Sequence, residues 1–168
     1  KENILLGKFA REFIINLPKT LKTKKNPKPT ASMVPNGYLL MFGPDKAEEQ
    51  YKALENHKEC EAGTKNIKGS DLSNIFSYIN NDGIETATYT DNETEGWIDP
   101  FLFHGALKSK AEELGAKFIK GNIKSLSEIK AKTIVSAAGC WTKELLNDIP
   151  IVPQKHTVFR AVSYTHLT

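Results

Sequence analysis

The chain has 168 residues, a length that suits one compact domain or one part of a larger protein. Its 39% hydrophobic and 26% charged residues are typical of a globular chain and exclude a wholly disordered one. No apolar run approaches the roughly 20 residues that cross a bilayer, so we expect no membrane span. Because residue 1 is Lys rather than Met, we interpret the chain as an internal fragment without its N-terminus.

Positive charge is concentrated at the start of the chain. Residues 1–30 carry eight basic and two acidic side chains, a balance of +6, whereas the remaining residues sum to −3. Much of the excess is a Lys- and Pro-rich segment that we interpret as a solvated linker. The alternative, a nucleic-acid patch, lacks an aromatic side chain to stack on a base, so we expect no nucleic-acid partner. The segment contains Lys19, Lys22, Lys24, Lys25 and Lys28, interleaved with Pro18, Pro27 and Pro29.

Four helices are predicted from apolar periodicity and capping residues. The first covers residues 3–17, with Leu5, Phe9, Phe13 and Leu17 on one stripe, and should stop at Pro18. The other three start signals are Asp45 with Glu48 as a capping box, Ser70 before a shorter helix, and Asp99-Pro100. The predicted buried residues are Ala47, Tyr51 and Leu54 in the second helix, and Phe103, Leu107 and Leu114 in the last, which should end at Gly115.

Five segments have the pattern of β-strands. Residues 37–42 are a short apolar run, and residues 84–90 are predicted as a second strand. Residues 116–123 alternate like a half-buried strand, residues 133–136 are β-branched like a central one, and residues 151–161 alternate again like an antiparallel strand. The order of helices and strands predicts an α/β layer.

The segment 134–145 is the strongest candidate for chemistry. It reads as a buried strand, a turn of small residues at Ala137, Ala138 and Gly139, and a new helix. Such a turn suits a phosphate-bearing cofactor, because small side chains allow close approach and a helix N-terminus presents free N–H groups. The alternative is that the residues are small only so that helix and strand can pack, and no Gly-x-Gly-x-x-Gly fingerprint occurs in the chain.

Several motifs occur together in an order that resembles the D-amino-acid oxidase and sarcosine oxidase superfamily of FAD-dependent oxidoreductases. Within it, the chain is most similar to the mitochondrial FAD-dependent oxidoreductase domain-containing proteins of the complex I assembly factor type. The resemblance covers roughly residues 3–161. It rests on Asn3-Ile4, Asn16-Leu17-Pro18, Asn36-Gly37-Tyr38-Leu39-Leu40, Gly96-Trp97-Ile98-Asp99-Pro100, Glu113-Leu114-Gly115-Ala116, Gly121-Asn122-Ile123, Ser136-Ala137-Ala138-Gly139-Cys140-Trp141 and Ile149-Pro150-Ile151-Val152-Pro153.

The resemblance implies FAD as cofactor and a mixed fold, with part of a Rossmann-like α/β FAD-binding domain interleaved with part of an antiparallel-sheet substrate domain. The whole protein would then oxidise a C–N bond of a secondary amine or amino acid of the sarcosine, glycine or D-amino-acid type. The alternative is a non-catalytic flavin-binding assembly factor whose partners are respiratory complex I intermediates. A mitochondrial location follows only from the resemblance.

The resemblance also implies the site residues and the domain boundaries. Ile123 would contact adenine through its main chain, the turn of Ala137, Ala138 and Gly139 would lie against the adenosine and pyrophosphate, and Trp141 would pack beside it. The fingerprint and the flavin-facing residues would lie outside the chain, so we expect the fragment alone to be inactive and to bind FAD poorly. The implied division is residues 1–30, a FAD-domain helix and linker; 31–96, substrate domain; 97–150, FAD domain; and 151–161, a substrate-domain return strand.

Residues 162–168, Val-Ser-Tyr-Thr-His-Leu-Thr, resemble a translated sequencing adapter, with natural sequence as the alternative. No catalytic residue and no metal ligand is assigned. His104 is expected to be solvent-facing or hydrogen-bonded, Asp99 a helix cap, Trp97 a core anchor and Cys140 a packing residue. Cys60 and Cys140 are 80 positions apart and are expected to be two reduced thiols.

Overall fold

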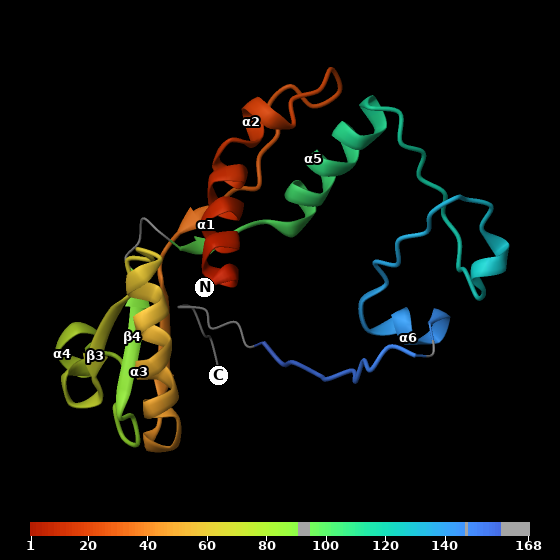
Figure 1. Cartoon of the computed structure of the whole chain (residues 1–168). Coiled ribbons are helices and arrows are strands. Elements are labelled where there is room, and N and C mark those ends of the chain that lie inside the picture. Colours follow the sequence, from red (N-terminus) through yellow and green to blue (C-terminus); the bar gives the residue numbers. More distant parts are fainter. Residues whose placement is uncertain (91–94, 147, 159–168) are drawn as a thin grey trace, which may run out of the picture. The chain divides into compact units, whose positions relative to one another are not determined.

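The computed structural model describes residues 1–90, 95–146 and 148–158 and divides into two compact units, Lys1–Phe118 and Ile119–Thr168. None of the helices in these residues is long and apolar enough to cross a membrane. The helices of the first unit, shown in Figure 1, are α1 (Glu2–Ile15), α2 (Leu17–Thr20), α3 (Pro44–Glu59), α4 (Leu72–Ile75) and α5 (Pro100–Glu113). Its strands are β1 (Val34–Pro35), β2 (Tyr38–Phe42), β3 (Lys65–Lys68), β4 (Thr86–Thr90) and β5 (Gly96–Trp97).

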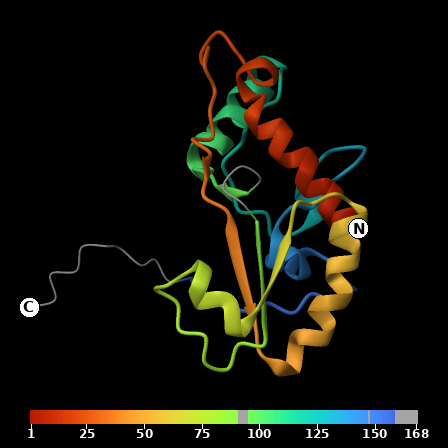
Figure 2. The same ribbon diagram turned by 90° about the vertical axis from the view of Figure 1, so that its left-hand side faces the viewer.

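A three-stranded antiparallel sheet of order β2-β4-β3 forms one part of this unit, as Figure 2 shows. The predicted strands at 37–42 and 84–90 are confirmed as β2 and β4, paired with Leu40 opposite Thr88. The third strand, β3, was not predicted because Lys65-Asn66-Ile67-Lys68 carries one apolar residue only. A separate pair, β1 with β5, was also not predicted, since each strand has two residues. The small antiparallel sheets agree with the expected mixed fold of helices and sheet, and the assignment of residues 31–96 to a substrate domain stays a prediction.

The two faces of the central strand β4 differ in chemistry. On one face, Ala87 joins Ile67 and Leu72 in a buried apolar core. On the other face, Thr86, Thr88 and Thr90 are all buried. Helix α3 covers the threonine face, where Gln50 donates to the Thr88 hydroxyl at 3.4 Å. The predicted burial of Ala47 and Leu54 in α3 is confirmed, but Tyr51 is exposed.

The second core of this unit joins α1 and α2 to α5. Its buried residues are Leu17, Leu21, Ala31 and Ala106, and the ring of Phe13 meets that of Phe103 edge-on at 6.5 Å. The predicted apolar stripes are therefore only half buried. Toward the N-terminal end of α1, Leu5 and Phe9 are exposed. On α5, Leu107 is exposed and Ala106 fills the contact, and Leu114, directly after the helix, is exposed as well.

Three predicted helix boundaries differ in the structure. Pro18 does not follow the first helix directly; α1 ends at Ile15, and Pro18 lies in the first turn of α2, where no amide donor is needed. Helix α3 begins at Pro44, so Asp45 lies inside the first turn and makes no capping bond. Helix α4 begins at Leu72, with Ser70 in the preceding 3-10 turn, Gly69–Asp71.

The predicted start of α5 is confirmed. The Asp99 side chain accepts hydrogen bonds from the main-chain N–H groups of Phe101 at 2.8 Å and Leu102 at 3.1 Å, with Pro100 as the first helical residue. The end is confirmed as well, since Gly115 follows the helix with φ +97°, a left-handed conformation that glycine tolerates. This helix is therefore positioned by signals that lie within its own sequence.

Replacing Asp99 by Ala should destabilise the protein by about 1 kcal/mol, because two amides of α5 lose their acceptor. Urea unfolding followed by circular dichroism measures the change. Asp99→Asn is the matched control, since an amide oxygen still accepts these bonds. Equal stability of the Ala and Asn variants would show that the cap contributes nothing.

The predicted solvated linker is ordered and partly buried. Leu21, Thr23 and Pro29 are buried within it, while its lysines are exposed. The segment is therefore not wholly solvated, because Leu21 packs in the core with Leu17 and Ala106. We name residues 19–28 the basic loop.

The second unit contains short helical turns and no strand in its described residues. These turns are a 3-10 turn at Leu126–Glu128, another at Gly139–Trp141, and α6 (Thr142–Leu145). The strands predicted at 116–123 and 133–136 are extended segments without a ladder, as is the described part of 151–161. A strand requires a hydrogen-bonded neighbour, and the described residues of this unit supply none. The adapter-like residues 162–168 lie outside the described residues.

Candidate functional site

The second unit forms an open pocket of about 610 Å³, which we call the cavity. Three stretches of chain form its walls: the end of the predicted strand at 116–123 with the turn that follows, the predicted strand at 133–136 with its small-residue turn, and α6 with the residue before it. The lining residues are Gly121, Asn122, Ile123, Lys124, Leu126, Ile129, Ile134, Val135, Ser136, Ala137, Ala138, Trp141, Glu144 and Leu145.

One wall is fixed by a capping box around a single 3-10 turn. The Glu128 carboxylate accepts from the main-chain N–H of Ser125 at 2.8 Å and of Lys124 at 2.9 Å. The Ser125 hydroxyl accepts in return from the N–H of Ser127 at 3.3 Å. These bonds satisfy amides that a short turn leaves unpaired, and they hold Leu126 in the wall of the cavity.

The opposite wall turns at Gly139, whose φ of +58° lies in the left-handed region. A Cβ built there meets no atom within 4 Å, so the requirement for glycine is conformational rather than steric. The N–H of Trp141 donates to the carbonyl of Ala138 at 3.1 Å, and the hydroxyls of Ser136 and Thr142 lie 3.3 Å apart. Thr142 is buried, so this pair ties the two sides of the turn together.

The structure brings four of the five predicted site residues to this cavity. Ile123, Ala137, Ala138 and Trp141 line it, although Ile123 and Trp141 are separated by 18 positions in sequence. Gly139 shapes the turn but is not among the lining residues. The side chains that line the cavity are apolar or small on most sides, with Lys124 and Glu144 as the charged groups.

The sequence profile of the family described as FAD dependent oxidoreductase matches residues 4–166 of the chain, nearly its whole length. The chain belongs to the FAD dependent oxidoreductase family.

Two relatives that resemble the chain carry the same name. FAD-dependent oxidoreductase domain-containing protein 1 of Bos taurus is 27% identical over 122 residues, covering 73% of this chain and 25% of that protein. The protein of the same name from Xenopus laevis is 28% identical over 135 residues, covering 80% of this chain and 27% of that protein. The chain thus spans about a quarter of the length of these relatives.

A solved structure shares the fold. The crystal structure of L-proline dehydrogenase from P. horikoshii matches with a TM-score of 0.57 and 22% sequence identity, covering 83% of this chain and 39% of that chain. At this identity the match establishes the fold, a mixture of helices and small antiparallel sheets of the FAD dependent oxidoreductase type.

One element of the predicted site is different in the structure. The helix expected after the small-residue turn is a 3-10 turn followed by α6, which has four residues. Because a macrodipole requires several aligned turns, the helix N-terminus supplies little positive potential here. The cavity, rather than a helix N-terminus, is therefore the candidate cofactor site.

Sequence reasoning missed the residues that complete the cavity. Leu126, Ile129 and Leu145 supply apolar wall, and Lys124 and Glu144 supply charge. The signal for the turn was present as Ser125-Leu126-Ser127-Glu128, whose Ser and Glu are three residues apart as in a capping box.

The remaining candidates have the structural roles expected of them or none that contributes to the site. His104 is exposed, and Cys60 and Cys140 are free thiols, as expected. Trp97 is 55% exposed, so its expected role as a core anchor was wrong. In the part of the chain that the structure describes, no group of three or more His, Cys, Asp or Glu side chains could hold a metal ion.

Proposed function

We propose that the cavity of the second unit binds the adenosine part of FAD, and that the whole protein is an oxidoreductase acting on the C–N bond of an amine or amino acid. The observation that carries the proposal is the common cavity of Ile123, Ala137, Ala138 and Trp141. The family resemblance places Ile123 at the adenine, the turn of Ala137 and Ala138 against the adenosine and pyrophosphate, and Trp141 beside it, and a single concave site lined by all four supports that role.

The residues of the cavity fit an adenine nucleotide. Small-molecule sites occupy about 300–1,000 Å³ and are mostly apolar with a few polar groups, and the cavity of about 610 Å³ lies in this range. Ile123 and Trp141 offer apolar surface for a flat purine ring. The methyl side chains of Ala137 and Ala138 leave the main chain open to a ribose or a phosphate.

The residues of this chain would bind and orient the cofactor rather than react. Ile123 and Trp141 would cover part of the purine, and the polar side chains of Asn122 and Ser136 line the same cavity, where they could form hydrogen bonds to the nucleotide. When bound, FAD supplies the redox chemistry by accepting the electrons released from the oxidised C–N bond. The flavin-facing residues and the Gly-rich fingerprint are expected in the rest of the protein.

The same proposal assigns residues 97–150 to a Rossmann-like domain. The extended segments at 116–123 and 133–136 have the composition of strands, and we expect them to pair with strands supplied by other parts of the protein. Residues 1–30 contribute a helix to this domain, whereas residues 31–96 and 151–161 belong to the antiparallel substrate domain.

An amine or amino acid is the proposed substrate class. The fold shared with an L-proline dehydrogenase supports it. The second candidate is a flavin-binding assembly factor for mitochondrial respiratory complex I. It rests on the sequence resemblance to the mitochondrial FAD-dependent oxidoreductase domain-containing proteins of the assembly factor type. Anaerobic bleaching of the flavin by sarcosine, proline or a D-amino acid supports the enzyme, and unchanged absorbance with each of them supports the assembly factor.

Ala138→Leu in the whole protein should weaken FAD binding about tenfold or more, because the larger side chain fills the cavity and overpacking costs roughly 1–3 kcal/mol. Binding is measured by quenching of flavin fluorescence, and ADP binding by calorimetry should weaken in parallel. Ala131→Leu, at an exposed position outside the cavity lining, is the matched control and should bind both ligands normally. Unchanged ADP affinity in a folded Ala138→Leu variant would place the adenosine elsewhere.

A further inference from the structure

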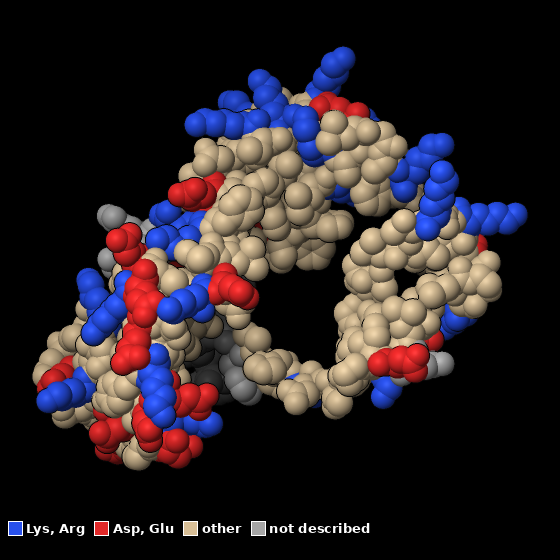
Figure 3. Space-filling model, viewed as in Figure 1, with Lys and Arg blue, Asp and Glu red and all other residues tan. Residues whose placement is uncertain are grey.

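The basic loop presents an unusual run of one charge. No acidic residue occurs between Glu12 and Asp45, and five lysines fall within this stretch: Lys19, Lys22, Lys24, Lys25 and Lys28. All five are exposed. Figure 3 shows blue side chains gathered over the end of the first unit where α2 and α5 finish, projecting outward rather than lining a groove.

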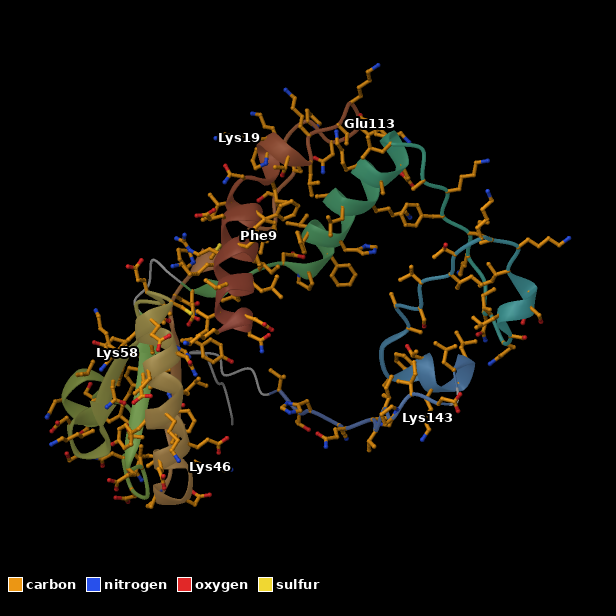
Figure 4. All side chains as sticks on the ribbon, viewed as in Figure 1. Phe9, Lys19, Lys46, Lys58, Glu113 and Lys143 are labelled. Atoms are coloured by element: carbon orange, nitrogen blue, oxygen red, sulfur yellow. The ribbon has the colours of Figure 1, made fainter. Side chains whose placement is uncertain are left out.

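The loop is held mainly through its main-chain groups, and the side chains of its lysines take no part in these bonds. The N–H of Lys24 donates to the Glu113 carboxylate at 3.0 Å, and the Lys110 ammonium donates to the carbonyl of Lys22 at 3.1 Å. Thr23 and Asn26 close the turn, with the Asn26 N–H donating to the Thr23 hydroxyl at 2.8 Å. Figure 4 shows Lys19 and Glu113 at this end of the unit. The charge is therefore presented on an ordered scaffold.

The carboxylate of Glu113 is already bound to the Lys24 N–H and the Lys110 ammonium, so it is not available to pair with the exposed lysine side chains of the loop. Glu113 accepts from the Lys24 N–H and from the Lys110 ammonium, and these bonds lower the pKa of its carboxyl below the usual value. It therefore remains ionised and bound within the loop at neutral pH. The lysines of the loop together with Lys110 form what we call the basic patch, with Glu112 and Glu113 as the acidic side chains of the adjoining turn of α5.

We infer that the basic patch docks the protein on the surface of an anionic lipid bilayer. A cluster of about four to eight lysines is the composition that attracts acidic headgroups, and each lysine near such a surface raises the binding constant by about fivefold. Outward-pointing lysines on one loop can meet a flat surface together. Single-stranded nucleic acid instead favours a groove with aromatic stacking platforms, and residues 14–37 contain no aromatic side chain.

The test measures co-sedimentation of the whole protein with phosphatidylcholine vesicles that contain or lack phosphatidylserine. Binding should require phosphatidylserine and should weaken as salt screens the charges. The combined substitution of Lys22, Lys24 and Lys25 by Gln should reduce the affinity about a hundredfold. It should leave the fold intact, as circular dichroism can verify, since the loop is anchored by main-chain groups.

The control replaces Lys46, Lys52 and Lys58 of α3 by Gln, which changes the net charge equally at an exposed site on another element. Its binding should be nearly that of the wild type. Three results overturn the inference: equal binding to vesicles without phosphatidylserine, an equal loss in the α3 control, or binding of duplex DNA as tight as that of vesicles at the same salt concentration. The last result would assign the patch to a nucleic acid.

Discussion

Gly69→Ala should destabilise the protein by about 3 kcal/mol or more, the largest effect expected from the loss or gain of a single methyl group. A Cβ at this position would lie 1.7 Å from the carbonyl oxygen of Ile84 and 2.6 Å from its carbon. These are main-chain atoms and cannot rotate away. The next residue, Glu85, donates to the carbonyl of Phe42 at 2.9 Å, so displacing the segment also disturbs the entry to β4.

The matched control for this substitution is Gly7→Ala. Gly7 lies inside α1 and a Cβ there meets no atom within 4 Å, so alanine should stabilise the helix by about 0.5–1 kcal/mol. Urea unfolding of both variants measures the difference. A Gly69→Ala protein as stable as the wild type would show that the main chain at Gly69 and Ile84 can shift apart at little cost.

Leu17→Ala should cost about 3 kcal/mol, within the usual range of 2–5 kcal/mol for a fully buried leucine. Leu17 has no exposed surface and lies where α1, α2 and α5 meet, beside Leu21 and Ala106. Its truncation leaves a cavity that the surrounding helices can only partly close. The measurement is the free energy of unfolding in urea, with the m-value checked for constancy.

Two further variants separate burial from helix propensity. Leu6→Ala removes the same atoms from a side chain of α1 that is 64% exposed, and it should change the stability by less than about 1 kcal/mol. Leu17→Met keeps the volume and should cost less than about 1.5 kcal/mol. Similar losses in Leu6→Ala and Leu17→Ala would contradict the position of this core.

The elements that could be predicted are those specified by neighbouring residues. The Asp99-Pro100 start and the Gly115 end of α5 are short-range signals, and both are confirmed. Strands β2 and β4 carry enough consecutive apolar or β-branched residues to be recognised. The sequence did not predict how much of the apolar stripes of α1 and α5 is buried. Apolar periodicity predicts which face of a helix is apolar, but not how many of its turns another element covers.

The predictions that failed concern segments whose structure depends on contacts between residues that are distant in sequence. Strand β3 exists because it pairs with β4, and the Thr86 hydroxyl of β4 donates to the Asn66 side chain and to the carbonyl of Ile67. The residues Lys65-Asn66-Ile67-Lys68 by themselves do not reveal these partners. The basic loop resembled a linker in composition, yet Glu113, nearly ninety positions away, holds it. Conversely, the segment 133–136 has a strand composition and no ladder in the described residues, since composition cannot provide a partner.

The structure brings four of the five residues taken from the family resemblance to one cavity. Their role as cofactor contacts stays a prediction. The charged residues Lys124 and Glu144 were missed, since neither belongs to a motif. The expected helix dipole was wrong because α6 has one turn.

The way the basic loop is fastened has an evolutionary consequence. Since its lysines contribute only their peptide groups to the attachment, the side chains at positions 22 and 24 are free to drift without loss of the native structure. Selection can therefore alter the electrostatic character of this corner, from cationic to neutral or anionic, through single codon changes. Orthologues that do not dock on an anionic bilayer can therefore lose the lysines at these positions and still keep the α5 anchor.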